Sequence, residues 1–157
     1  MQRISDVIDE YLSVCEFPFV SSADDGVRWV PIAGQHGAWY LALSPRDELW
    51  QLIAHSVMTE RVPVRRRREV ALYLTRANLG LVLGNFEFDL DDGSVRYKTS
   101  IDVEGGELSV ELVDHLVLAN LTTFDRHLPG IRAVMGGDNA AEAFAAIEPT
   151  VPAAATA

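Results

Sequence analysis

The spacing of apolar residues at the start of the chain predicts an amphipathic helix over residues 3–15. The residues that recur there at intervals of three and four are Ile4, Val7, Ile8, Tyr11, Leu12 and Cys15. This spacing places them on one side of a helix. No comparable helical pattern follows before residue 64. We therefore expect the apolar side of the first helix to cover a sheet.

Short runs of β-forming residues separated by turn residues follow this helix. The runs cover residues 17–20, 27–32, 38–43 and 49–59. Strands joined by such short turns must be antiparallel, because a parallel return needs a crossover of about a dozen residues. The last run also fits a helix over 47–58, since Leu49, Leu52 and Ile53 have helical spacing. A strand is our preferred interpretation.

Three further helices are predicted in the rest of the chain. Pro63 begins a helix over 64–78, which ends before Gly80. Ser109 is a suitable N-cap for a long apolar helix over 109–127. A last short helix is expected over 139–147.

A β-hairpin over residues 81–103 is the strongest local prediction. Apolar residues alternate on both arms, and the turn residues Asp91-Asp92-Gly93 separate them. If Asp92 and Gly93 form a two-residue loop, the cross-strand pairs are Phe88 with Tyr97, Leu90 with Val95, Glu87 with Lys98 and Asp89 with Arg96. This register matches apolar residues on one side and opposite charges on the other.

These elements predict the α+β class, with a twisted antiparallel sheet flanked by helices in one domain over residues 1–148. Residues 149–157 have few large apolar side chains, and we expect a disordered C-terminal tail.

The chain is acidic, with 13 basic and 23 acidic residues among 157 and a formal charge of −10. This charge repels phosphate backbones and anionic lipids, so we expect neither a nucleic-acid nor a membrane partner. The single cysteine, Cys15, cannot form an internal disulfide, and the N-terminus has no signal-peptide pattern. These features predict a cytoplasmic protein.

The sequence contains no motif that predicts a metal, a cofactor or a catalytic residue. An EF-hand loop starting at Asp89 would need glycine where Ser94 stands and glutamate where Ser100 stands, so the acidic run is interpreted as a hairpin turn. No two of the histidines have metal-ligand spacing; they are His36, His55, His115 and His127. Nucleophile-elbow, P-loop and dinucleotide-binding motifs are absent.

Two other groups of residues have a structural and a functional interpretation. Arg61 and the run 65–68 gather five basic residues, which we interpret as a solvated helix face pairing with acids of this chain or of a second copy. The tryptophans Trp29, Trp39 and Trp50 are expected to pack on the sheet. If one of them lies on an exposed sheet face, it is a candidate anchor for a bound peptide.

The chain resembles the YbjN family of bacterial proteins. The residues that carry the likeness are Arg61-Val62-Pro63 with the basic helix after it, NLGLVLGNFEFD at 78–89, DGSVRYKTS at 92–100, and 102–106 leading into the Ser109 helix. The likeness covers about residues 1–148 and is most specific over 61–130. It implies a fold similar to type III secretion chaperones, a role in sensory transduction, and no catalytic motif.

We therefore expect a non-enzymatic, chaperone-like or regulatory module that binds a segment of another protein, with no catalytic, cofactor or metal residues. The alternative is a small-molecule-binding or hydrolytic enzyme with a site near His115 and Asp114. A cleft that joins these two with a hydroxyl group would favour the enzyme, whereas a flat apolar groove or a free sheet edge would favour peptide docking. The resemblance, the apolar helix 109–127 and the arginine-rich helix also suggest a homodimer.

Overall fold

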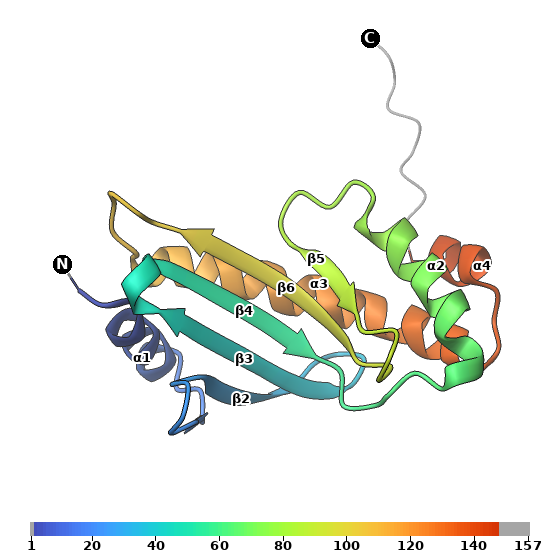
Figure 1. Cartoon of the computed structure of the whole chain (residues 1–157), viewed down its shortest axis with the longest axis horizontal. Helices are drawn as coiled ribbons and strands as arrows, with labels where there is room; N and C mark the ends of the chain where they lie inside the picture. The colour runs from blue at the N-terminus through green and yellow to red at the C-terminus, as the bar shows by residue number, and fades with distance from the viewer. Residues whose placement is uncertain (1, 148–157) are drawn as a thin grey trace, which may run out of the picture.

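A computed structural model describes residues 2–147 of the chain, and within them it forms one six-stranded antiparallel sheet with helices (Figure 1). The strand order is β1-β2-β3-β4-β6-β5. The strands are β1 (Val20–Ser21), β2 (Arg28–Ala33), β3 (Ala38–Arg46), β4 (Gln51–Val57), β5 (Asn85–Phe88) and β6 (Val95–Asp102). The α-helices are α1 (Ile4–Val14), α2 (Arg67–Asn78), α3 (Val110–Gly136) and α4 (Ala140–Ile147). The antiparallel α+β prediction is confirmed. The predicted tail, 149–157, lies outside the described residues.

The helices cover one face of the sheet. In Figure 1, α3 crosses behind the strands and no helix lies in front of them. The burial of β4 follows this division, because Leu52, Ala54 and Ser56 are buried while the residues between them are half-buried. Alternate residues of a strand point to opposite faces, so one face of β4 meets the helices and the other does not.

Two apolar clusters fill the space between the sheet and the helices. In one, α1 and the first half of α3 pack on β2, β3 and β4, with Ile8, Leu41 and Val117 fully buried. In the other, α2, α4 and the second half of α3 pack on β5 and β6 around Phe124 and Tyr97. The sheet therefore uses its whole inner face for its own core.

The long helix extends further than predicted. Ser109 caps α3 as expected, its hydroxyl accepting a hydrogen bond of 3.2 Å from Leu112 N–H. The helix then continues past the predicted end at 127 to Gly136, with Pro129 inside it. Proline removes one helical hydrogen bond, but the turns after it bury Ile131 and Val134 completely. This burial offsets the lost bond.

The predicted hairpin register is wrong by two residues. Phe88 pairs with Val95, not with Tyr97, and Phe86 takes the place opposite Tyr97. The loop is longer than two residues, since Gly93 N–H donates to Asp89 O and Asp89 N–H donates to Ser94 O. A shift of two residues leaves every side chain on its face, so the alternation of apolar residues does not distinguish the two registers.

The first arm of the hairpin is also shorter than predicted. Residues 81–84, part of the predicted first arm, lie outside β5, and Val82 among them is exposed. At 47–58 the strand prediction is confirmed and the helical alternative is wrong, apart from a single 3₁₀ turn over Asp47–Leu49. Among residues 2–147, no helix combines the length and apolar character needed to cross a membrane.

Candidate functional site

One face of the sheet carries no helix (Figure 1). We call it the open face. The strand registers place the following residues on it: Val20, Trp29, Pro31, Ala33, Tyr40, Ala42, Ser44, Arg46, Gln51, Ile53, His55, Val57, Asn85, Glu87, Arg96, Lys98, Ser100 and Asp102. The face divides into an apolar half on β1–β4 and a charged half toward β5 and β6.

Two aromatic side chains stand on the apolar half. Trp29 on β2 is 40% exposed, and Tyr40 on β3 is 48% exposed. Trp29 lies between its register partners Val20 and Ala42. Buried aromatics dominate the energetics of protein interfaces. Two large rings partly exposed on an uncovered sheet face are therefore candidate anchors for a partner.

Glu87 organises the charged half. Its carboxylate accepts hydrogen bonds from Lys98 Nζ at 2.6 Å and from Arg96 Nε at 2.5 Å. Partial burial opposes ionisation of Glu87, but these bonds outweigh it and lower its pKa. His55 Nε2 lies 3.4 Å from the same carboxylate. Burial, with the nearby Arg96 charge, lowers the pKa of His55 and keeps its ring neutral.

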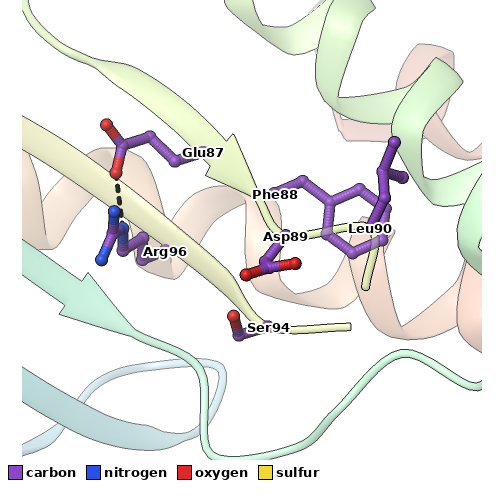
Figure 2. Close-up of a pocket in the computed structure, with 6 residues that line it drawn as sticks. All are labelled: Glu87, Phe88, Asp89, Leu90, Ser94 and Arg96. Carbon is purple, nitrogen blue, oxygen red and sulfur yellow. Dashed lines mark hydrogen bonds and ion pairs between the residues drawn. The ribbon is translucent and has the colours of Figure 1, made fainter. Parts of the chain in front are cut away.

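A hollow of about 410 Å³ lies at the loop end of the β5–β6 hairpin (Figure 2). Its lining residues are Glu87, Phe88, Asp89, Leu90, Ser94 and Arg96. Figure 2 shows the Glu87–Arg96 pair at one side and the Phe88 ring with Leu90 at the other. The hollow thus joins charged groups to apolar surface.

Each end of the sheet has a feature that hinders an added strand. On β5, Asn78 Nδ2 donates to Phe86 O at 3.2 Å, and Phe86 N–H donates to Asn78 Oδ1 at 2.7 Å. At the other end of the sheet, Val27 O just before β2 accepts a hydrogen bond from Ser22 N–H on the β1 side. Every second residue of a strand directs its backbone groups to the same side, so the backbone nitrogen of Pro31 also faces the β1 side. Proline has no N–H to offer. Both features take backbone groups away from a partner strand.

The three tryptophans have three different environments. Trp29 lies on the open face, as the anchor hypothesis requires. Trp39 is buried, and its Nε1 donates to Ser56 Oγ at 2.9 Å. Trp50 is half-buried and packs against the cluster beneath α1. The sequence analysis did not identify Tyr40 as an exposed ring or Asn78 as a partner of β5. Pro31, inside a predicted strand, was a signal that this strand lies near an edge of the sheet.

The arginines at the start of α2 divide between two roles. Arg66 donates to Val134 O and Asp138 O, and Arg67 donates to carbonyl oxygens of the hairpin loop. These two are part of the fold, which corrects the prediction of a fully solvated face. Arg61 pairs with Asp92 of this chain, as one interpretation expected. Arg65 and Arg68 remain exposed.

The two residues named for the enzyme alternative lie on the surface of α3. His115 and Asp114 are both exposed on α3, and neither lines the hollow in Figure 2. His127 is buried, with its Nδ1 2.9 Å from the Tyr73 hydroxyl, and His36 pairs with Asp125 at 3.2 Å. Among residues 2–147, no three histidine, cysteine or acidic side chains are grouped to hold a metal ion.

Known proteins share this fold. The crystal structure of YbjN from E. coli, described as "a putative transcription regulator", matches with a TM-score of 0.58 and 10% identity over 79% of this chain and 89% of that chain. A chain from the HopA1–SchA chaperone–effector complex matches with a TM-score of 0.50 and 18% identity over 77% and 88%. A chain from the ExsC–ExsE complex matches with a TM-score of 0.52 and 16% identity over 80% and 93%.

These structural likenesses confirm the chaperone-like α+β fold that the resemblance implied. None of these proteins is described as an enzyme. No curated protein sequence matches the chain. The model of the YbjN family, described as "Putative bacterial sensory transduction regulator", matches residues 5–133. Because this match covers most of the sequence, the chain belongs to the YbjN family.

Proposed function

We propose that the protein is a non-enzymatic binding module that holds an extended segment of another protein across its open face. The observation that carries this proposal is the exposure of Trp29 and Tyr40 on a sheet face that no helix covers. A chaperone–effector complex among the proteins of similar fold supports a protein as the partner. A shared fold does not by itself imply a shared function, so the proposal rests on the residues of the open face.

The edges of the sheet bear on how such a segment binds. Strand addition would need free backbone groups, but Asn78 binds those of Phe86 on β5, and Pro31 on β2 has no N–H to donate. The segment therefore lies on the face and contacts side chains. Its apolar residues pack on Trp29 and Tyr40, and a carboxylate fits beside Arg96 and Lys98, two cations that share the one carboxylate of Glu87.

Three sequence predictions belong to the same proposal. The binding unit is one domain over residues 1–148. It acts in the cytoplasm, where its one free cysteine, the exposed Cys15, stays reduced. It binds neither nucleic acid nor membrane, since its charge of −10 opposes both.

A homodimer is a separate proposal. The apolar long helix and the arginine-rich helix suggested it from the sequence. In the structure, the inner side of α3 packs on its own sheet, and Arg66 and Arg67 bind carbonyl groups of their own chain, so much of both surfaces is already occupied. A dimer would have to form through other surfaces. Light scattering at micromolar concentration tests it, since a mass of 17.3 kDa that dilution leaves unchanged means a monomer.

Site-specific photo-crosslinking tests the open face. A benzoylphenylalanine at Tyr40 should capture a partner in the native host, and the same probe at Leu118, exposed on the outer side of α3, should not. The captured partner is then purified, and its Kd is measured with the wild-type chain and with Trp29→Ser. We expect the Kd to rise by about tenfold or more, the loss of about 1.4 kcal/mol of binding energy. Equal capture at both positions, or an unchanged Kd, would contradict the proposal.

A further inference from the structure

A second surface, on α2 and its connection to β5, exposes large apolar side chains. Leu79 is 86% exposed and Val82 is 93% exposed, and Leu72 and Leu83 also lie in water. The connection arches away from the sheet beside the end of α2 (Figure 1). We call these four residues, together with Arg65, Arg68 and Arg76, the α2 surface.

The fold holds this apolar loop in a defined shape. Leu81 packs against the core while the residues on both sides of it face solvent. The Tyr97 hydroxyl donates a hydrogen bond to Leu83 O. Gly84 has a φ of +75°, and a Cβ there would lie 2.2 Å from Lys98 O, so the loop passes too close to β6 for any other residue. Its exposed side chains are thus presented by anchored backbone.

The charge of the α2 surface is opposite to that of the whole chain. Arg68 and Arg76 are exposed on α2, and Arg65 is exposed in the 3₁₀ turn Val64–Arg66 just before it. None of the three forms an ion pair with another residue of 2–147. Helical periodicity places Arg68 and Arg76 on one side with Leu72 and Leu79. The chain as a whole carries −10. Apolar side chains bordered by unpaired cations characterise a recognition surface for an acidic partner.

We propose that the α2 surface binds an acidic amphipathic helix of another protein. Leu72 and Leu79 are seven residues apart, two helical turns or about 10 Å. A partner helix with apolar residues at positions i, i+3 or i+4, and i+7 spans the same distance. Glutamates on its flanks would pair with the arginines. The one acidic residue of α2, Glu69, is bound to α4 instead, since its Oε1 accepts a hydrogen bond of 3.0 Å from Ala140 N–H.

Charge complementarity favours this occupant over two others. A second copy in a two-fold contact would bring the same surface against itself, and thus arginine against arginine. An anionic bilayer is broad enough to meet the acidic remainder of the molecule as well as the α2 surface, and that remainder would be repelled. A single helix contacts the cationic surface alone.

Fluorescence anisotropy with a synthetic peptide tests the proposal on the full chain. The probe is a labelled helix of about four turns with leucines on one side and glutamates on both flanks, and its partner peptide has glutamine in place of each glutamate. We expect saturable binding of the acidic probe that weakens with added salt. The glutamine peptide should bind about tenfold more weakly or worse.

Variants on exposed positions locate the binding. The double variant Leu79→Ser/Val82→Ser and the single variant Arg68→Glu should each raise the Kd of the acidic probe by about tenfold. Leu118→Ser, an exposed leucine on α3, and Trp29→Ser on the open face should leave it unchanged. The last control separates this site from the proposed function.

Three results would overturn the proposal. The first is no saturable binding of the acidic probe, or equal binding of the glutamine peptide. The second is a wild-type dimer that Leu79→Ser/Val82→Ser converts to monomer in light scattering, which would make a second copy the occupant. The third is binding to phosphatidylserine vesicles that the same double variant abolishes, which would make a membrane the occupant.

Discussion

The side chain of Asn78 forms hydrogen bonds with both the N–H and the C=O of Phe86, at 2.7 and 3.2 Å. Asn78 is the last residue of α2, and Phe86 lies in the edge strand β5. One amide side chain thus takes the place of a neighbouring strand. Replacement by alanine would remove both bonds from a partly buried backbone, and we expect Asn78→Ala to lower the free energy of unfolding by about 1–3 kcal/mol.

Urea unfolding followed by circular dichroism measures this effect. The control is Thr75→Ala on the same helix, because the Thr75 hydroxyl bonds only a carbonyl of its own helix and is exposed. Light scattering of Asn78→Ala should also show more self-association than the control, since the variant frees backbone groups at the edge. If the two variants are equally stable, the Asn78–Phe86 pair does not support the edge.

Two glycines of α3 provide a matched test of packing. A Cβ on Gly130 would lie 2.3 Å from the Tyr73 hydroxyl oxygen, whereas a Cβ on Gly136 would meet nothing within 4 Å. Alanine favours a helix over glycine by about 1 kcal/mol. We therefore expect Gly136→Ala to raise the stability slightly. Gly130→Ala should lower it by about 1–3 kcal/mol, because Tyr73 is buried and cannot move freely.

Thermal and urea unfolding of the two glycine variants give the comparison directly. Stabilisation by both substitutions would mean that the Tyr73 ring yields, and that the contact between α2 and α3 is looser than the structure shows.

Much of the fold follows from periodic patterns that short segments contain. The helix at 3–15, the strand at 49–59 and the Ser109 cap are local features, and each is confirmed. The end of α3 depends on distant packing instead. Pro129 predicts a helix end locally, but burial of Ile131 beneath α2 and α4 outweighs that preference. No pattern near residue 129 contains this information.

The candidate sites were less predictable because both depend on what the fold leaves uncovered. Trp29 and Trp39 stand in similar strand patterns, and only the placement of all helices on one face exposes the first. Val82 fits the alternation of a strand. It lies outside the sheet because β5 spans only Asn85–Phe88, and the hairpin register is shifted by two residues as well. Alternation alone cannot detect a shift of two.

His55 predicts how stability depends on pH. Its ordinary pKa is 6.5, and in the folded chain burial and the Arg96 charge lower it, with Lys98 acting the same way and Glu87 opposing. The unfolded chain therefore binds a proton at a higher pH than the folded chain does. The contribution of neutral His55 to the stability is complete above pH 6.5, and it is lost as the pH falls below that value toward the pKa of the folded chain.

The measurement is the melting temperature of wild type and His55→Gln from neutral pH down to about pH 5. We expect the variant to lose less stability than wild type over this range. His115→Gln, which alters an exposed histidine, should follow the wild-type curve. Parallel curves for wild type and His55→Gln would show that other groups cause the acid sensitivity.

The last prediction concerns the two tryptophans, Trp29 and Trp39. Trp39 is 3% exposed and donates its indole N–H to Ser56, so Trp39→Ala should cost about 3–5 kcal/mol of stability. Trp29 is 40% exposed, and Trp29→Ala should cost about 1 kcal/mol or less. Urea unfolding of the two variants gives both values. A cost at Trp29 equal to that at Trp39 would assign Trp29 to the core, and the open face would lose its main anchor. A small cost, together with loss of the photo-crosslinked partner in Trp29→Ala, would mean that this ring serves binding rather than folding.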